Sequence, residues 1–553
     1  MRGFNQNRLL AVYIIIMLFS GLIFFRLYTV SVSDFGVIMP ALNSQHSRRL
    51  NIAERRGFIF DRNGRIIAGR AGLYNALIDP SKIDPENIHD AGGELALISN
   101  LDLESIMQQL KNGVPFIIQT HESLSNNYAR SYPTYSRALD NNAAVHILGY
   151  LDSEKKGAAG LESAYNYLLE KTGAGVYAVY SSDALNKSFR SEPMRTVDSG
   201  YNNKTGLALT LDFNLQEQLE KIASEHLNKG AVIIADVKTG EILTSISRPV
   251  FALDNLAAYI ESENGEFINR AFSAFTPGSV FKTVVAAAAL ESHPSYYDFT
   301  HDCTGTIDIS GRIFRCFRLW GHGELNMTEA YAESCNTYFM ALALDIGYAE
   351  IYAAAKNLGV GEFGSLDGLR VSRGNMRDLI NPPPALTANT AIGQGELLIT
   401  PLEAARIFCA IANGGVMPEL SLAKSIIFEN KLIDLSNRAL RRVLSEQTVS
   451  YLQEMARACV QTGTGISAAP VSGMAGGKTS SAESGQFINI INEDGEPERE
   501  QIVHSWFAGY YPAEPEREPS YSICVIAEGG VNENVRSAEI FKLICDYLGG
   551  FIY

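Results

Sequence analysis

The sequence predicts an α+β protein in which an antiparallel sheet is flanked by helices and which begins with one membrane-spanning helix. Strand patterns occupy residues 207–247 and 504–528, and helical patterns fill most of the chain between them. Strands that frame a helical middle are typical of a sheet covered by helices. An uncharged apolar stretch over residues 9–25 predicts the membrane helix.

The apolar stretch reads LLAVYIIIMLFSGLIFF, and with the apolar residues after Arg26 it approaches the roughly 20 residues that span a bilayer. A cleaved signal peptide would have a shorter apolar core followed by a small-x-small site, so we favour an uncleaved anchor over residues 9–30. Arg2 and Arg8 precede it without an acidic residue, which favours a cytoplasmic tail over residues 1–8. We therefore expect a single-pass protein of the cell membrane whose remaining chain lies outside the cytoplasm.

The chain has 553 residues, which is too long for one core, because domains usually hold roughly 100–200 residues. Residues 31–206 offer no cluster of reactive side chains, and strand and helix patterns become regular from Leu207 onward. We expect an N-terminal pedestal domain over residues 31–206 and a second domain over residues 207–553. The formal net charge of -15 disfavours nucleic acid as a partner and otherwise keeps the protein soluble.

The seven cysteines are too sparse for a disulfide scaffold. Cys303 and Cys316 are the only close pair, and they either form a disulfide outside the cell or stay as two free thiols. The chain has no CxxC pair, and its nine histidines are scattered. The sequence therefore predicts no metal site and no cofactor.

The elements of the first 250 residues follow from short patterns. DRNG between two apolar runs predicts a hairpin over residues 58–68, and GLESAYNYLLEK has apolar residues at helical spacing over residues 160–171. LALTLD from Leu207 predicts a strand, and NLQEQLEKIASEHL predicts an amphipathic helix over residues 214–227. GAVIIADVKTGEILTSIS predicts a hairpin over residues 230–247.

Helices predominate in the middle of the second half. TPGSVFKTVVAAAALE predicts a buried helix with an alanine-rich tail, and NMTEAYAESCNTYFMALAL predicts one helix over residues 326–344. The helix predicted over residues 400–415 ends in two glycines, a typical stop. Strands at 504–511 and 521–528 and a helix near 537–548 follow.

Ser279 and Lys282 in TPGSVFK are spaced to share a helix face just after a turn. Serine is inert as a nucleophile until a base takes its proton, and a lysine near its usual pKa of roughly 10.4 cannot be that base. Burial and a second nearby cation would lower the lysine pKa and free the amine. Taken alone, the pair equally fits a helix-capping serine followed by a surface lysine.

Two further motifs follow in chain order. The triplet Ser334-Cys335-Asn336 lies in the predicted helical stretch, and it offers a hydroxyl that relays a proton and an amide that holds a carbonyl. Lys478 and Thr479 precede a predicted strand-turn-strand, and they offer the second cation and a hydroxyl for a carboxylate. Together, and in this order, the three motifs favour Ser279 as a nucleophile and Lys282 as its base over the capping serine and surface lysine.

Serine-x-x-lysine, a serine-containing triplet and lysine-threonine-glycine, in this order, are typical of penicillin-binding proteins and related β-lactamases. The chain resembles a class B penicillin-binding protein, a monofunctional peptidoglycan D,D-transpeptidase, over nearly its whole length. The matching segments include RGFIFDRNG, AAGLESAYN, NRAFSAFTPGSVFK, HGELNMTEAYAESCNTYF, AIGQGELLITPLEAARIFCAIANGG and HSWFAGYYP. This resemblance implies the transpeptidase fold of penicillin-binding proteins for residues 207–553.

The third motif departs from the family pattern. Lysine-threonine-glycine occurs literally three times, at residues 171–173, 204–206 and 238–240, but always before the nucleophile. At the family's position the chain reads GGKTSSAES, so Ser480 replaces the glycine and Ser481 replaces the second threonine. We expect an active enzyme. Glycine at this position often marks close backbone approach, so whether Ser480 shifts the strand and slows acylation, or alters β-lactam affinity, stays open.

The resemblance implies an acyl-transfer mechanism. Ser279 attacks the carbonyl of a stem peptide that ends in D-Ala-D-Ala, Lys282 takes the proton, and the resulting acyl-enzyme is resolved by the amine of a neighbouring strand. The backbone N–H groups of Ser279 and Ser481 form the oxyanion hole. β-Lactams are trapped at Ser279 by the same route.

The remaining site residues are implied in the same way. Ser334 and Lys478 pass a proton to the leaving D-alanine, Asn336 holds the substrate, and Thr479 and Ser481 bind the terminal carboxylate. A monofunctional enzyme needs a separate glycan polymerase as partner. A D,D-carboxypeptidase or β-lactamase, and a non-catalytic scaffold or β-lactam sensor, stay open as alternatives, as does a role in elongation, division or sporulation.

Overall fold

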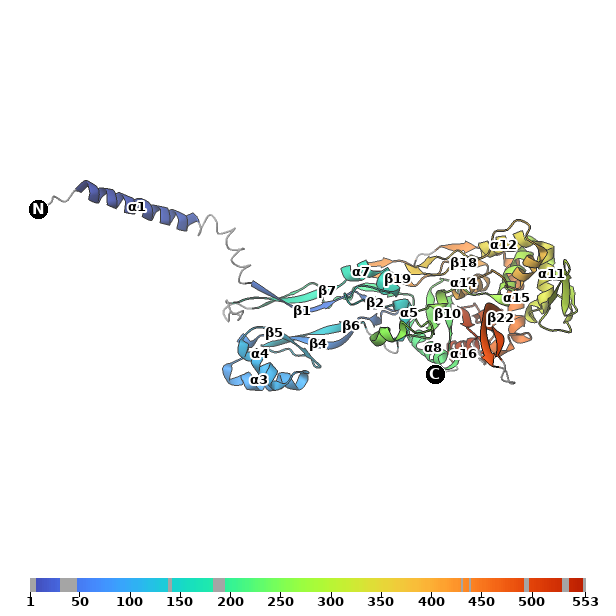
Figure 1. Cartoon of the computed structure of the whole chain (residues 1–553), viewed down its shortest axis with the longest axis horizontal. Coiled ribbons are helices and arrows are strands. Elements are labelled where there is room, and N and C mark those ends of the chain that lie inside the picture. Colours follow the sequence, from blue (N-terminus) through green and yellow to red (C-terminus); the bar gives the residue numbers. More distant parts are fainter. Residues whose placement is uncertain are drawn as a thin grey trace. The chain divides into compact units, whose positions relative to one another are not determined.

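A computed structural model describes residues 6–29, 47–137, 142–182, 194–428, 431–436, 439–491, 497–529 and 537–550 (Figure 1). The chain forms two compact units that alternate along the sequence. The second unit contains residues 204–553 and also residues 57–70 and 137–172, which lie within the predicted pedestal. The predicted domain boundary between residues 206 and 207 stays a prediction.

The N-terminal helix α1 (Gln6–Tyr28) contains the predicted anchor. Residues 7–28 are long and apolar enough to cross a membrane, and their side chains are exposed. Residues 1–5 and residue 30, to which the predicted tail and anchor extend, lie outside the described residues.

The first unit contains two three-stranded sheets, ordered β5-β4-β6 and β1-β7-β8. Two helices, α3 (Ile88–Ile98) and α4 (Leu103–Asn112), pack on the first sheet through Leu95, Ile106 and Leu110. The strands are β1 (Ser47–Arg55), β4 (Arg70–Ile78), β5 (Phe116–Thr120), β6 (Ala129–Ser136), β7 (Ala174–Ser181) and β8 (Arg195–Asp198).

The second unit is built on a five-stranded sheet ordered β11-β10-β24-β23-β22, in which all neighbours are antiparallel. The predicted hairpin over residues 230–247 and the two late strands all belong to it and are confirmed. Its strands are β10 (Gly230–Asp236), β11 (Ile242–Arg248), β22 (Gly476–Ile491), β23 (Pro497–Tyr511) and β24 (Tyr521–Ala527).

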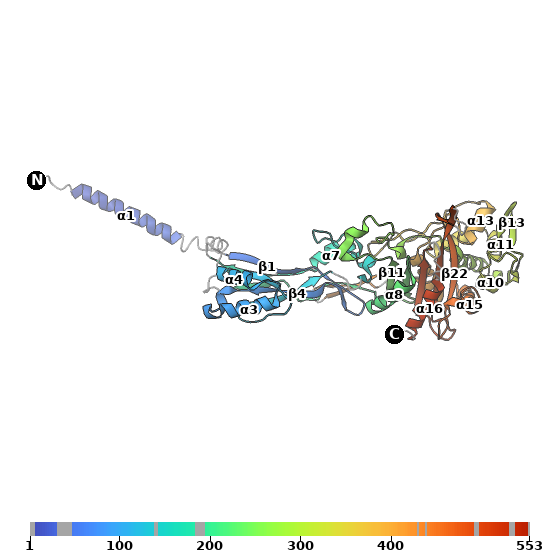
Figure 2. The same ribbon diagram turned by 60° about the horizontal axis from the view of Figure 1, so that its bottom comes forward.

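Helices cover both faces of this sheet. Val232 and Ile234 of β10 pack in one core with α8 (Phe213–His226) and α16 (Ser537–Leu548) (Figures 1 and 2). Ala231 and Ile233 face a second core that includes α14 (Pro401–Ala412). Both faces of β10 are therefore apolar, and the predicted α+β fold of a sheet flanked by helices is confirmed.

A helical region extends from the second core beside the edge strand β22, and α15 contacts β22 directly. Its helices are α9 (Lys282–Ser292), α10 (Met327–Ala332), α11 (Asn336–Ile346), α12 (Tyr348–Asn357), α13 (Pro384–Ala391) and α15 (Glu446–Gln461). Four short strands precede α10: β12 (His301–Cys303), β13 (Thr306–Ile309), β14 (Arg312–Arg315) and β15 (Gly323–Leu325).

The predicted hairpin over residues 58–68 is confirmed as the antiparallel pair β2–β3, and it joins a second sheet ordered β20-β19-β9-β2-β3. The predicted helix over residues 160–171 is two short helices that meet at Tyr165. The elements are β2 (Phe58–Phe60), β3 (Ile66–Ala68), α5 (Val145–Leu148), α6 (Gly160–Ala164), α7 (Asn166–Lys171), β9 (Gly206–Leu209), β16 (Ser365–Leu366), β17 (Leu369–Arg370), β18 (Val416–Pro418), β19 (Ala423–Phe428), β20 (Lys431–Asp434) and β21 (Leu440–Arg442).

The prediction of one helix over residues 326–344 is wrong. The helix stops at Ala332 and a new one begins at Asn336, because Ser334 between them adopts a left-handed backbone conformation with φ of 55°. The amide of Cys335 donates to the carbonyl of Ala330 at 2.9 Å, which closes the turn. The break places the predicted triplet on a corner between two helices.

Candidate active site

Lys282 is the centre of the candidate site, and its side chain is fully buried. Its Nζ donates to the carbonyl oxygen of Ser334 at 2.6 Å and to Asn336 Oδ1 at 2.7 Å, and it lies 3.3 Å from Ser334 Oγ. Because Ser334 is on the corner between α10 and α11, both its carbonyl and its hydroxyl reach the amine. The structure thus joins the first two predicted motifs.

Ser279 lies one turn before this lysine, on the 3-10 turn η7 (Gly278–Phe281) that leads into α9. The turn begins at Gly278, whose φ of 53° is a conformation that favours glycine. The amide of Gly278 donates to the carbonyl of Gly393 at 3.0 Å, which holds the turn in place. Ser279 is half-buried and lines a cavity of about 470 Å³ together with Ser334 and Asn336.

The third motif is on β22, the edge strand of the large sheet, and not before a strand as the sequence suggested. Lys478 is fully buried opposite Ala508 of β23, and its Nζ lies 5.5 Å from the centre of the Tyr331 ring. Thr479, Ser480 and Ser481 line the same cavity as the nucleophile. The strand therefore forms one wall of the site.

The two buried lysines govern the electrostatics of the site. Burial, and then the positive charge of Lys478, lower the pKa of the Lys282 amine well below its ordinary value of 10.5. Cys335 and Cys316 oppose this shift. Burial also lowers the pKa of Lys478. Burial and a second nearby cation are the two conditions under which we expected Lys282 to act as a base.

Several residues of the cavity were not predicted from the sequence. Thr464 Oγ1 hydrogen-bonds Thr479 Oγ1 at 2.6 Å, and the amide of Thr464 donates to the carbonyl of Ala332 at 3.0 Å. The other unpredicted lining residues are Phe317, Ile392, Gln394, Ser467, Ser505, Trp506, Ser537 and Ala538. They come from separate loops, from β23, from a 3-10 turn and from the start of α16. Four of them, Ile392, Gln394, Ser505 and Trp506, lie in the matching segments AIGQGELLITPLEAARIFCAIANGG and HSWFAGYYP, but the sequence assigned them no role.

Residues 230–546 match the family model "Penicillin binding protein transpeptidase domain". The chain belongs to this family. The resemblance to class B penicillin-binding proteins is thereby confirmed, and the matched region contains all three motifs.

Two curated relatives extend the similarity beyond the matched domain. Stage V sporulation protein D of Bacillus subtilis is 27% identical over 522 residues, which cover 87% of this chain and 75% of the relative. Peptidoglycan D,D-transpeptidase MrdA of Escherichia coli is 23% identical over 490 residues, which cover 77% of this chain and 75% of the relative. Each relative is a longer chain that this one matches over three quarters of its length.

A solved structure described as "Structural coordination of polymerization and crosslinking by a peptidoglycan synthase complex" contains a chain of the same fold. The TM-score is 0.70 at 22% identity, and the match covers 100% of this chain and 99% of that chain. The likeness shows that the fold extends over the N-terminal residues as well as the transpeptidase domain.

Ser480, the departure from the family's glycine, lies beside the nucleophile turn. A Cβ on Gly278 would overlap Ser480 Oγ, so the Ser480 side chain packs directly against the backbone of Gly278. Among the described residues, this buried hydroxyl has no hydrogen-bond partner. The residues around it keep their regular pairing, Thr479 with Phe507 and Ser481 with Ser505, so the backbone of β22 accommodates the serine.

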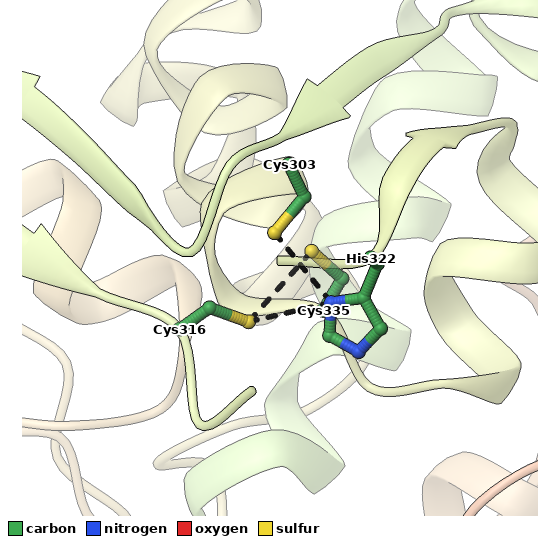
Figure 3. A group of neighbouring side chains, drawn as sticks. All are labelled: Cys303, Cys316, His322 and Cys335. Atoms are coloured by element: carbon green, nitrogen blue, oxygen red, sulfur yellow. Dashed lines mark hydrogen bonds between the residues drawn. The ribbon is translucent and has the colours of Figure 1, made fainter. Parts of the chain in front are cut away.

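A second cluster of reactive side chains lies behind the triplet. Cys303, Cys316, His322 and Cys335 bring three sulfur atoms and one imidazole nitrogen within 4.8 Å of one another (Figure 3). The sequence predicted no metal site, because the cysteines have no CxxC spacing and only Cys303 and Cys316 are close. The spacing Cys-x12-Cys-x5-His-x12-Cys is the signal that could have indicated the cluster. All seven cysteines are free thiols, including the pair that was a candidate disulfide.

Proposed function

We propose that this protein is a peptidoglycan D,D-transpeptidase that cross-links stem peptides through an acyl-enzyme on Ser279. One observation carries the proposal. The fully buried Lys282 lies one turn from Ser279, which lines the cavity. Lys282 donates hydrogen bonds to Ser334 and Asn336, and the positive charge of Lys478 lowers its pKa. Membership of the family supports the same reaction.

In the first step, the Oγ of Ser279 attacks the carbonyl carbon between the two terminal D-alanines. The neutral amine of Lys282 takes the hydroxyl proton, which it can do because its pKa is lowered. The backbone N–H groups of Ser279 and Ser481 stabilise the oxyanion, and each such donor contributes about 3 kcal/mol in the transition state. The carbon–nitrogen bond then breaks, and the ester on Ser279 remains.

The leaving D-alanine needs a proton as its amine departs. Ser334 supplies it and takes in return the proton that Lys282 removed from Ser279, because its hydroxyl lies 3.3 Å from Lys282 Nζ and lines the cavity. Lys478, buried on β22 behind the residues that line the cavity, provides a positive charge near Lys282. Thr479 and Ser481 bind the terminal carboxylate. Asn336 accepts from Lys282 and orients the amine. The amine of a second stem peptide then attacks the ester carbonyl and loses a proton to the neutral Lys282. The ester C–O bond breaks, Ser279 Oγ takes the proton back from Lys282, and the new amide bond is the cross-link.

The membrane topology and the partner follow from the same proposal. Helix α1 anchors the protein with its N-terminus in the cytoplasm, as Arg2 and Arg8 indicate, and the transpeptidase domain faces the peptidoglycan. A separate glycan polymerase supplies the strands. The structural similarity to a chain of a peptidoglycan synthase complex supports such an assembly.

Labelling with a fluorescent penicillin tests the nucleophile. We expect the full-length protein in detergent to form a covalent adduct that survives denaturing gel electrophoresis, because β-lactams acylate the same serine. Ser279→Ala should abolish the band. Ser292→Ala, at the far end of α9, removes a serine outside the cavity and should label like the wild type. An unlabelled wild-type protein would favour the non-catalytic scaffold.

The products of a lipid-linked peptidoglycan substrate then separate the enzyme classes. With a glycan polymerase present, a transpeptidase forms cross-linked dimeric peptides, which mass spectrometry resolves from trimmed monomers. Monomers that have lost one D-alanine, without dimers, would instead identify a carboxypeptidase. Ser279→Ala should eliminate both products.

A further inference from the structure

The cysteine-histidine cluster has the geometry of a tetrahedral zinc site. Zinc binds sulfur at about 2.3 Å and imidazole nitrogen at about 2.0–2.1 Å, so in a tetrahedron two sulfurs lie about 3.8 Å apart and a sulfur and a nitrogen about 3.5 Å apart. Cys316 Sγ and Cys335 Sγ are 3.9 Å apart. His322 Nδ1 lies 3.5 Å from Cys303 Sγ and 3.6 Å from Cys316 Sγ. These three separations match the edges of a zinc tetrahedron.

Backbone hydrogen bonds hold the four donors in this arrangement. The amide of His322 donates to the carbonyl of Cys303 at 2.9 Å, and the amide of Cys316 donates to the carbonyl of Gly305 at 2.8 Å. Gly321 has φ of 83°, and a Cβ there would overlap the carbonyl oxygen of Cys303, so the loop must carry glycine next to His322. The donors are therefore preorganised by loops whose close packing does not depend on the side chains.

The chemistry of the donors selects the ion. Three thiols and one imidazole are soft ligands that suit zinc, whereas calcium and magnesium require oxygen ligands. The three cysteine side chains are buried, between 0% and 2% exposed, and His322 is half-buried. The cluster thus offers four protein ligands, which is the number that a tetrahedral zinc ion takes. Four protein ligands without an open position are typical of a structural zinc site rather than a catalytic one.

We propose that Cys303, Cys316, His322 and Cys335 bind one Zn²⁺ ion, which fixes the active-site triplet. Cys335 is the middle residue of Ser334-Cys335-Asn336, and its neighbours on both sides accept hydrogen bonds from Lys282. A zinc–sulfur bond to Cys335 ties the corner between α10 and α11 to the segments that carry the other ligands. The ion thereby acts on the reaction only through the position of the triplet.

Metal analysis of the full-length protein in detergent tests the site directly. After incubation with zinc sulfate and extensive dialysis, mass spectrometry of the metal content should find about one zinc per chain. Substitution by cobalt should give the absorption spectrum of a tetrahedral thiolate site. A wild-type protein without bound zinc, or one in which thiol titration finds a disulfide among the three cysteines, would overturn the proposal. These measurements do not depend on transpeptidase activity.

Matched cysteine variants locate the site. Cys316→Ala should lose the zinc, whereas Cys524→Ala removes an equally buried thiol on β24 and should keep it. Zinc bound equally by both variants would place the ion elsewhere. If Cys316→Ala does not fold, the metal content and cobalt spectrum of the wild type still decide the question.

The positioning role has its own readout. Removal of zinc from the wild type with a chelator should lower the thermal unfolding temperature and slow penicillin labelling by roughly tenfold or more, because displacements of about 1 Å at a reacting group cost up to about 100-fold. Added zinc should restore both. An unchanged labelling rate after complete removal of zinc would refute the positioning role, even if the metal site itself is confirmed.

Discussion

Substitution of Gly278 by alanine tests how the unusual Ser480 is accommodated beside the nucleophile. The φ of 53° at Gly278 costs an alanine roughly 1–2 kcal/mol, which corresponds to a factor of about 5–30 in the population of the native turn. The new Cβ would also overlap Ser480 Oγ and lie 3.0 Å from Ala482 Cβ. Relief of this overlap moves Ser279, and a shift of about 1 Å costs about 100-fold in rate. The two effects multiply, so we expect Gly278→Ala to slow acylation by roughly 500–3,000-fold.

The double variant Gly278→Ala/Ser480→Gly separates the two causes. It removes the overlap with Ser480 Oγ but keeps the backbone strain, so its acylation rate should recover to about 5–30-fold below wild type. Ser480→Gly alone should stay near wild type, because the hydroxyl that it removes has no hydrogen-bond partner among the described residues. The assay is the second-order rate of labelling by a fluorescent penicillin, measured by quenched-time gel analysis.

A control places a similar backbone strain away from the nucleophile turn. Gly485 lies in β22, the strand that carries Ser480, and has φ of 73°. No atom lies within 4 Å of the position that a Cβ would occupy there, so Gly485→Ala should leave the labelling rate near wild type. If the double variant labels no faster than Gly278→Ala, the overlap with Ser480 is not the cause of the defect. The reasoning about the pair would then be refuted.

Two further predictions concern pH and stability. Penicillin labelling should rise with pH as Lys282 loses its proton, and it should level off well below pH 10.5. Lys478→Ala should move this rise to higher pH because it removes a charge that lowers the Lys282 pKa, whereas Lys478→Arg keeps the charge and should not. A rise at an unchanged pH in Lys478→Ala would contradict the coupling between the two lysines. Thr400 accepts from the amide of Glu403 at 3.0 Å in a buried capping box at the start of α14, so Thr400→Ala should destabilise the domain by about 1–2 kcal/mol, measured as a lower thermal unfolding temperature. Ser445→Ala at the exposed start of α15 is the comparison and should cost less; equal losses would show that burial of the cap adds nothing.

Local patterns were sufficient for the elements whose side chains and neighbours in sequence decide the structure. The apolar run of α1, the hairpin of β10 and β11, and the glycine stop after α14 all depend on residues a few positions apart. The order of the three motifs also identified the family, because long matching segments survive at low overall identity. The roles of the individual site residues stay predictions that the labelling and pH experiments test.

Only the tertiary structure decided the features that depend on contacts between distant segments. The triplet sits on a break rather than within a helix because the Cys335 amide closes a turn on Ala330, an arrangement that helix periodicity does not indicate. Lys282 is buried because α9 packs inside the helical region. Burial is the largest cause of its lowered pKa, and the charge of Lys478, which is distant in sequence, is the next.

The cysteine-histidine cluster and the pair of Gly278 and Ser480 have the same origin. The cluster gathers donors from four separate segments, and the pair joins Gly278 of the nucleophile turn to Ser480, 202 residues later in the chain. The sequence by itself thus determined the strands of the large sheet, most of the helices and the family. The fold decided which side chains meet, because close packing brings together atoms whose separation along the chain holds no information about their distance in space.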